Sequence, residues 1–220
     1  MTPRVTLTFD NGPTPGVTEE VLDVLAGVDL RATFFVVGDS LRQPGGRDLV
    51  RRAAAGGHWI GHHTMTHTVL LGDAEDAGAA VQAEIADLAR EMEEFDGAIP
   101  LFRPYAKGGV LDHRVLSEAA VRYLQEHRYT CVLWNSVPRD WEDPLGWVDR
   151  ALASVFSQPW TVVVLHDTAS GAMRLLPRFL DELAAGGATV VQDFAESCLP
   201  IVAGKITQPL SHLVKQARLG

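Results

Sequence analysis

Five short segments of the sequence carry side chains that can bind a metal ion or transfer a proton. They begin at Asp10, His63, Arg103, Asp140 and His166. Each segment follows an apolar run, and the carboxyl ends of parallel strands are where functional groups gather in α/β proteins. Carboxylate and imidazole groups brought together in this way can perform general acid–base catalysis beside a bound cation. The sequence therefore predicts one functional site built from several strand ends.

The pair His63 and His67 has the spacing of a metal-binding motif. Four residues place both imidazoles on the same side of a helical turn, where they supply two of the ligands that an ion such as Zn²⁺ requires. Surface helices also produce this spacing, so the pair needs an oxygen ligand nearby. Asp10 and Asn11 offer two oxygens at the end of the first strand, although Asp-Asn-Gly-Pro is also a common turn sequence.

His166 directly follows an apolar, β-branched run, at the position where a general acid or base is expected. A histidine that ends a strand can equally be a hydrogen-bonded structural residue. Asp140 or Asp167 could orient the imidazole and set its pKa. Arg103 could hold Asp10 ionised by charge pairing, or it could form an ordinary salt bridge at the rim.

Seven strands alternate with six helices in the pattern of the sequence. We expect strands at 5–9, 33–37, 59–61, 101–103, 130–134, 161–165 and 189–192, and helices at 18–26, 47–55, 74–95, 112–127, 144–156 and 174–185. This alternation predicts a single α/β domain with parallel strands joined by right-handed crossovers. Periodicity does not distinguish a doubly wound sheet from a β/α barrel. The absence of a GxGxxG motif and of a P-loop argues against dinucleotide and nucleotide triphosphate binding.

The chain of 220 residues has 46% apolar residues and a formal net charge of -9. This composition is typical of a globular domain, and its acidity argues against nucleic acid as a partner. No apolar run reaches the ~20 residues of a membrane span. The N-terminus leads directly into the first strand without a visible signal peptide, so we expect a cytoplasmic protein, with unconventional export left open. No sequence feature indicates an oligomeric state.

The negative charge is concentrated in residues 73–96, which hold nine acids and one base. Apolar residues spaced 4, 3 and 4 apart in this segment predict a surface helix with a solvated acidic side. Residues 1–200 are expected to form the domain. Residues 201–220 are expected to form a C-terminal tail or a final helix packed on it.

Taken in order, the polar segments resemble the motifs of the polysaccharide deacetylases, also called carbohydrate esterase family 4 or NodB homology domains. Residues 8–13 resemble TFDDGP, residues 63–67 match H-[ST]-x-x-H, residues 102–105 resemble RPPY, residues 140–141 match the end of DxxDW, and residues 164–167 resemble the LxH motif. All five occur in the family's order, so the resemblance covers nearly the whole chain.

This resemblance implies a distorted (β/α) barrel of seven or eight parallel strands and hydrolysis of an N-acetyl amide on a sugar. It implies that Asp10 is the general base acting on metal-bound water and that His166 is the acid that protonates the leaving amine. The resemblance further implies a divalent metal, expected to be zinc, held by Asn11, His63 and His67. It implies that Arg103 and Asp140 support the acid–base pair. Substrate contacts are implied for Pro104, Tyr105 and Trp141, and oxyanion stabilisation for a backbone N–H near Tyr105.

Three departures from the family pattern leave alternatives open. Asn11 stands where the family has a metal-binding Asp, Val137 replaces the first acid of DxxDW, and the RPPY stretch lacks one proline. An amide donates no negative charge, so a cation would be held more weakly. One alternative is a metal-poor cytosolic hydrolase of small amides or imides resembling allantoinase or cyclic imidase. Another is a non-catalytic carbohydrate-binding barrel, against which the presence of Asp10, Arg103 and His166 argues.

Overall fold

A computed structural model describes residues 2–95 and 98–215 of the chain. Residues 1, 96–97 and 216–220 lie outside the described residues, and with them Asp96 of the acidic segment and the end of the predicted tail. The strands are β1 (Arg4–Asp10), β2 (Thr33–Val36), β3 (Trp59–His62), β4 (Ala98–Phe102), β5 (Thr130–Cys131), β6 (Trp160–His166), β7 (Thr189–Val191), β8 (Ile201–Val202) and β9 (Lys205–Ile206). The longer helices are α1 (Thr18–Gly27), α3 (Gly46–Ala55), α6 (Glu118–Glu126), α7 (Trp147–Ser157) and α8 (Leu176–Ala185).

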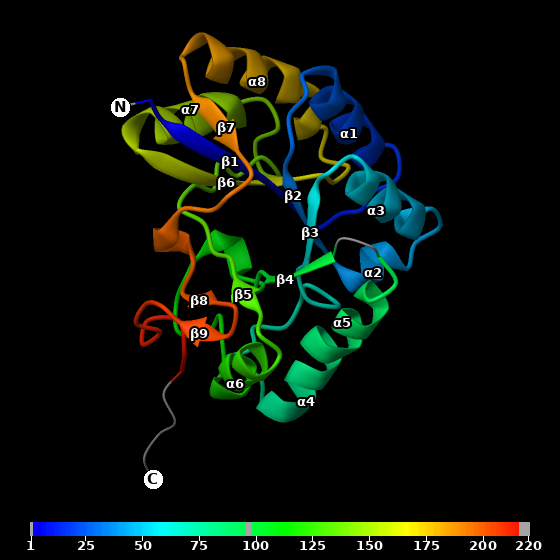
Figure 1. The fold of residues 1–220 in the computed structure, drawn as a ribbon, viewed down its shortest axis with the longest axis vertical. Coiled ribbons are helices and arrows are strands. Elements are labelled where there is room, and N and C mark those ends of the chain that lie inside the picture. Colours follow the sequence, from blue (N-terminus) through cyan, green and yellow to red (C-terminus); the bar gives the residue numbers. More distant parts are fainter. Residues whose placement is uncertain (1, 96–97, 216–220) are drawn as a thin grey trace.

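The strands of the described residues form one curled sheet in the order β6-β1-β2-β3-β4-β5-β8-β9, and β7 also pairs with β1 (Figure 1). Strands β1 to β7 pair in parallel, while β8 and β9 pair antiparallel. The α/β fold expected from the sequence is confirmed as a deformed barrel in a single domain. Of the strands in the described residues, β8 runs against the others, and β9 turns back to the direction of β5.

Strand β5 is shorter than predicted, because the chain that follows it crosses to β6. Leu133 N–H bonds to the carbonyl of Cys198, and Asn135 N–H bonds to the carbonyl of Val162. Val164 N–H in turn donates to the carbonyl of Ser136 over 3.0 Å. The segment 132–136 therefore connects the chain before β8 with strand β6, without forming a regular ladder.

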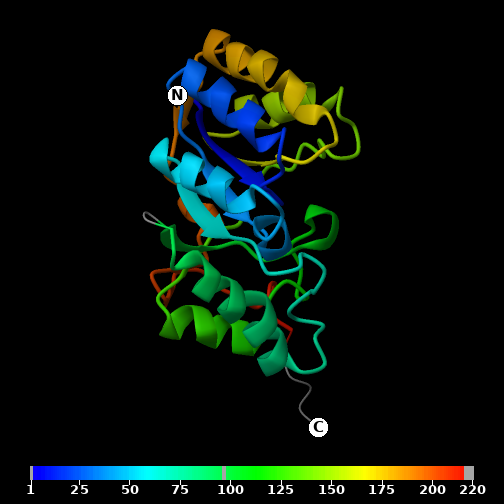
Figure 2. The same ribbon diagram turned by 90° about the vertical axis from the view of Figure 1, so that its right-hand side faces the viewer.

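Alternation along the strands divides the side chains between two apolar cores. Val5, Leu7 and Phe9 of β1 pack outward with residues of α1, α3, α7 and α8. Thr8 and Asp10, the other set of β1, lie on the barrel side in register with Val164 and His166. Figure 2 shows α1 and α8 at one end of the molecule, and α4 (Ala77–Val81), α5 (Asp87–Met92) and α6 at the other. Packing therefore fixes which side chains of β1 point into the barrel.

The acidic segment forms a helix that is interrupted by a π-helical turn. Its parts are α4 (Ala77–Val81), the π-turn η1 (Gln82–Ala86) and α5 (Asp87–Met92). Glu91 pairs with Arg42 and Arg47 across the surface, at 2.5 and 2.8 Å. Glu84 is buried, with 3% of its surface exposed. The prediction of a solvated acidic side is therefore wrong for Glu84, whose carboxylate is turned inward by tertiary contacts.

The described part of the tail, residues 201–215, forms the β8–β9 hairpin and a following turn. Strand β8 extends the sheet from β5, and Leu213 is buried. Lys215 forms an ion pair with Asp73 at 3.0 Å. The domain boundary at residue 200 stays a prediction. None of the helices in residues 2–95 and 98–215 combines the length and apolar character needed to span a bilayer.

Candidate active site

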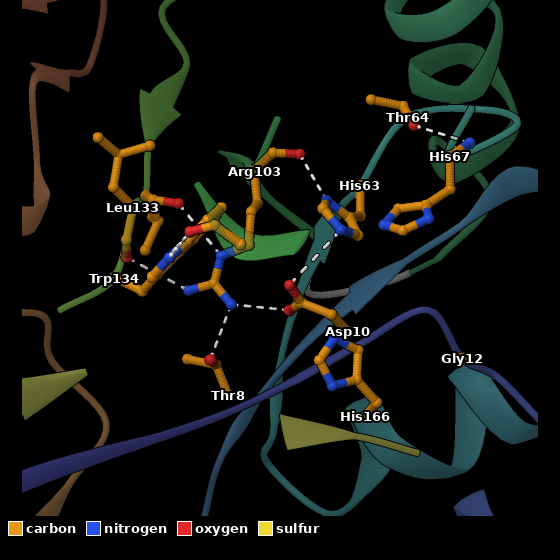
Figure 3. Close-up of polar contacts among 12 residues, drawn as sticks. Thr8, Asp10, Gly12, His63, Thr64, His67, Arg103, Leu133, Trp134 and His166 are labelled. Carbon is orange, nitrogen blue, oxygen red and sulfur yellow. Dashed lines mark hydrogen bonds and ion pairs between the residues drawn. The ribbon is translucent and has the colours of Figure 1, made fainter. Parts of the chain in front are cut away.

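Asp10 and His166 are the last residues of the neighbouring strands β1 and β6, and they are register partners. Parallel strands in register direct paired side chains to the same face, so both groups point to the C-terminal mouth of the barrel. Their spacing in the sequence is 156 residues, and the β1–β6 pairing alone brings them together. The structure thus places the two predicted acid–base residues side by side (Figure 3).

His63 and Arg103 reach the same site from the ends of β3 and β4. They directly follow His62 of β3 and Phe102 of β4, which are register partners, and Arg103 N–H donates to the carbonyl of His62 over 3.0 Å. Because successive residues of a strand alternate sides, His62 and Phe102 pack away from the site while the residues after them point into it.

Arg103 is a fully buried clamp between β1 and the segment after β5. Its guanidinium donates to Asp10 Oδ1 and to Thr8 Oγ1, each at 2.7 Å. It also donates to the carbonyls of Val132 and Leu133 and lies over the Phe35 ring, 4.0 Å from the ring centre. Burial lowers the pKa of Arg103, while Asp10 acts in the opposite direction. The guanidinium thus forms a buried, charge-assisted hydrogen bond with the Asp10 carboxylate and fixes its position.

The hydrogen bond of His63 fixes which of its nitrogens faces the site. Nδ1 lies 2.7 Å from the carbonyl oxygen of Arg103, which can only accept, so Nδ1 carries the proton. Nε2 therefore has a free lone pair, and it lies 3.5 Å from Asp10 Oδ2. Burial lowers the pKa of His63 to about 3, which keeps the imidazole neutral. A neutral imidazole held by a backbone carbonyl is the form that ligates metals.

The His63–His67 segment is a strained loop rather than the helical turn expected from its spacing. Thr64 and His67 have φ angles of 65° and 56°, in the left-handed region that costs energy for residues other than glycine. His67 N–H bonds to Thr64 Oγ1 at 3.1 Å. The two imidazole rings nevertheless lie 4.7 Å apart, and the His67 ring also contacts Tyr105. Burial lowers the pKa of His67 to about 3.

His166 is oriented by Asp140 on the opposite side of the site. Asp140 is fully buried and accepts from both the ring Nδ1 of His166, at 2.8 Å, and its backbone N–H, at 2.9 Å. Burial opposes protonation of His166, but the hydrogen bond and charge of Asp140 outweigh it, so the pKa of His166 is raised. The Trp141 ring packs edge-on against the imidazole, 4.7 Å between ring centres.

The sequence left open whether Asp140 or Asp167 orients His166, and in the structure Asp167 instead holds the loop that follows β1. Its oxygens accept from Gly12 N–H at 3.0 Å and from Thr18 Oγ1 at 2.6 Å, which holds the loop after β1 against β6. Burial raises the pKa of Asp167 to about 7. A Cβ on Gly12 would meet the Asp167 carboxylate at 2.1 Å, so any larger residue would displace that carboxylate from its hydrogen bonds.

These residues surround a pocket of about 230 Å³ that opens at the mouth of the barrel. Its lining includes Asp10, Asn11, His63, His67, Tyr105, Val137, Trp141 and His166. Pro104 is buried outside this lining, so its predicted contact with substrate gains no support from the structure. Val137 packs against Gly109 at the wall of the pocket, where the family's motif places a carboxylate.

The donor set at this pocket fits a divalent cation. No cluster of three His, Cys, Asp or Glu side chains in metal-binding geometry occurs in the part of the chain that the structure describes. Asn11 completes the set, because its Oδ1 is buried at the pocket and has no hydrogen-bond partner. One amide oxygen and two neutral imidazoles suit a borderline ion. An orphaned buried oxygen costs free energy that a bound cation would recover.

Three residues of this site escaped the sequence prediction as functional groups: Thr8, Asp167 in its loop-holding role, and Glu84. Thr8 carries no chemical signal beyond its place two residues before Asp10 on the same face of β1. Glu84 accepts from Thr66 between the two histidines, and its signal was hidden among the acids of residues 73–96. Long-range packing created all three roles.

The comparison with family models gives a match to the polysaccharide deacetylase family over residues 2–130. The chain is 37% identical over 174 residues to a chitooligosaccharide deacetylase of Sinorhizobium fredii, covering 75% of this chain and 72% of the relative. It is 32% identical over 191 residues to a peptidoglycan-N-acetylglucosamine deacetylase of Bacillus cereus, covering 83% of each. Sugar deacetylases among the relatives do not favour the small-amide hydrolase or the non-catalytic barrel.

Solved structures with the same fold include a family 4 carbohydrate esterase from Streptomyces lividans in complex with acetate. It shares 26% identity at a TM-score of 0.71, with 91% of this chain and 97% of that chain covered. A family 4 pseudoenzyme from Bacillus anthracis superimposes with a TM-score of 0.70 at 16% identity, which shows the fold alone. From its ordered motifs, its barrel and its matches, the chain belongs to the polysaccharide deacetylase family.

Proposed function

We propose that the protein removes acetyl groups from N-acetylglucosamine units of an oligosaccharide. The observation that carries the proposal is the in-register placement of Asp10 and His166 at one pocket, each with a buried partner of opposite charge type. Hydrolysis of an amide needs a base to activate water and an acid to protonate the amine. The sugar deacetylases among the relatives supply the substrate class.

Asp10 acts as the base in this proposal. Its Oδ1 is engaged by Arg103, and its Oδ2 faces the site beside His63. The Oδ2 lone pairs can take a proton from a water in the pocket as the water oxygen bonds to the acetyl carbon. Arg103 holds the carboxylate in place, and because burial excludes bulk water their pairing remains strong.

His166 acts as the acid. With its Nδ1 proton held by Asp140, the other ring nitrogen can donate a proton to the amide nitrogen as the carbon–nitrogen bond breaks. The products are acetate and the free amino sugar. Asp140 does not itself transfer a proton, since its role is to fix the ring and stabilise the imidazolium.

Asn11, His63 and His67 would hold a divalent cation, and zinc is the proposed identity because two imidazoles and one oxygen match its preferences. When bound, such a cation lowers the pKa of water and polarises a carbonyl. Tyr105, in contact with His67, and Trp141, in contact with His166, both line the pocket and are the proposed sugar contacts. The assignment of a backbone N–H near Tyr105 to the oxyanion stays a prediction.

The test is acetate release from N-acetylglucosamine oligomers of two to six units, with Zn²⁺ or Co²⁺ added. We expect turnover by the unaltered protein and a loss of roughly 10²-fold or more in Asp10→Asn and His166→Gln. Asp181→Asn, an exposed acid on α8, is the matched control. Absence of release with either metal by a correctly folded protein would contradict the proposal. A cytoplasmic location remains a separate proposal, which cell fractionation checks.

A further inference from the structure

Glu84 is a buried carboxylate with no metal-site or acid–base role in the mechanism above. Only 3% of its surface is exposed, and no lysine, arginine or histidine of the described residues forms an ion pair with it. Burying an unpaired carboxylate is costly unless several hydrogen bonds stabilise its charge. Glu84 lies beside the apolar face of the helix, next to the buried Val81, Ile85 and Leu88, so its carboxylate needs hydrogen-bond donors from another segment.

That partner is the middle of the His63–His67 loop. Glu84 Oε2 accepts from Thr66 N–H at 3.0 Å, and Oε1 accepts from Thr66 Oγ1 at 2.7 Å. The backbone carbonyl of Glu84 accepts from Met65 N–H at 3.0 Å. One residue thus satisfies three donors of two consecutive loop residues.

The π-helical turn gives Glu84 access to these donors. In a regular α-helix each carbonyl bonds to the N–H four residues on, whereas π-turns interrupt that ladder and often occur at functional sites. Glu84 lies within η1, and its carbonyl bonds to the loop. Both the side chain and the main chain of this turn therefore serve the loop.

The loop needs such support because its own conformation is strained. Thr64 and His67 flank the supported residues and both have positive φ angles. Without external hydrogen bonds the chain would relax toward more favourable angles, and the direction of the His67 imidazole would change with it. Figure 3 shows His63 and His67 side by side at the pocket, an arrangement that depends on this backbone path.

We propose that Glu84 is a positioning residue that holds the His63–His67 loop in the geometry required to bind a cation. The proposal rests on the proposed function for the use of the cation, but its structural part stands on the hydrogen bonds to Met65 and Thr66. Glu84 is not among the residues that line the pocket, and its hydrogen bonds go to Met65 and Thr66. Its effect on catalysis therefore passes through the loop.

The experiment compares Glu84→Ala, Glu84→Gln and the control Glu93→Gln, an exposed acid that directly follows the last residue of α5. For Glu84→Ala we expect the dissociation constant for Co²⁺, measured by calorimetry, to rise about tenfold or more. Amide hydrogen exchange in residues 62–68 of the cation-free protein should accelerate at least tenfold, with α1 and α3 unchanged. Glu84→Gln keeps one acceptor and should recover most of both properties, and Glu93→Gln should change neither.

A second comparison separates positioning from general stabilisation. In a Thr66→Val background, which lacks one of the bonded donors, Glu84→Ala should raise the dissociation constant by a smaller factor. An unchanged exchange rate in residues 62–68, or a fall in melting temperature with unchanged Co²⁺ affinity, would overturn the proposal. If the exchange and Co²⁺ results hold while acetate release is absent even in the unaltered protein, Glu84 keeps its role and the proposed function fails.

Discussion

Asp10 and His166 are adjacent groups whose partners set them to opposite tasks. Asp10 accepts a hydrogen bond from the Arg103 guanidinium, whereas the Asp140 carboxylate beside His166 favours the imidazolium. Because their partners carry opposite charges, Asp10 is suited to act as the base and His166 to act as the acid. At this scale the chemistry depends on single hydrogen bonds, so single substitutions test it.

Asp140→Asn should lower the pKa of His166, because it removes the charge that outweighs the burial of the imidazole. The acid must be protonated to act, so the basic limb of the plot of kcat/KM against pH should move to lower pH. At pH 8 we expect activity to fall roughly tenfold or more. Glu142→Gln, on the exposed part of the same loop, should leave the profile unchanged. An unmoved basic limb in Asp140→Asn would show that Asp140 does not tune His166.

Asn11→Asp should strengthen cation binding. The substitution replaces a neutral amide oxygen at the pocket with a charged one. A tenfold change in a dissociation constant corresponds to about 1.4 kcal/mol, and the attraction between a carboxylate and a nearby dication is several times larger before the cost of desolvation is subtracted. We expect the dissociation constant for Zn²⁺ to fall about tenfold or more in calorimetric titration. Gln125→Glu adds the same charge on exposed α6 and should have little effect. Equal affinities for Asn11→Asp and the parent would place the cation elsewhere.

At the scale of elements, the site is the junction of strand ends that do not all pair with one another. β1 and β4 are separated by β2 and β3 in the sheet, and Arg103 connects them across the barrel mouth. The same side chain also holds the irregular segment after β5 through two carbonyls. Removal of this clamp should affect both folding stability and activity.

Arg103→Met should lower the free energy of unfolding by about 3–5 kcal/mol, since it leaves the buried Asp10 without its counter-charge. Urea denaturation followed by circular dichroism measures this change. Arg122→Met is the control, because Arg122 is exposed and forms an exposed ion pair with Glu118 at 3.8 Å, and such pairs contribute about 1 kcal/mol or less. Equal losses for the two variants would contradict the clamp role of Arg103.

For the whole molecule, the buried histidines determine how stability responds to acid. Burial lowers the pKa of His58 to about 4 and that of His62, His63 and His67 to about 3. The unfolded chain protonates histidine near pH 6.5, so the stability is present above that pH and is lost as the pH falls toward the folded values. Asp167 acts in the opposite direction, because the folded protein keeps its proton up to about pH 7.

His62→Leu should make the protein less sensitive to acid. Both ring nitrogens of His62 are buried without partners between Phe102 and Tyr129, so the imidazole costs stability that leucine does not. With a chelator present, the slope of the unfolding free energy between pH 6 and 5 should decrease by about 1.4 kcal/mol per pH unit. His113→Asn, at an exposed histidine, should leave the slope unchanged. A steeper slope in His62→Leu would contradict the account.

Most of the elements could be predicted because local patterns encode them. The apolar runs before Asp10 and His166 became β1 and β6, and the helical spacing in 174–185 became α8, which begins at Leu176. Strand β5 ended early and the acidic helix acquired a π-turn, since both deviations arise from contacts with distant segments. The alternation of strands and helices predicted that the residues after each strand gather at one end of the barrel, but it did not predict which of them contact one another.

The sequence by itself determined the α/β class, the strand ends that carry the chemistry and the family to which the chain belongs. These features depend on residue type, spacing and order, which are local properties. Only the tertiary structure decided that Asp140 and not Asp167 orients His166, that His63 and His67 lie on a strained loop, and that Glu84 is buried behind it. Each of these outcomes depends on hydrogen bonds between residues 18 or more positions apart or on backbone angles that packing enforces. Spacing along the chain therefore does not encode them.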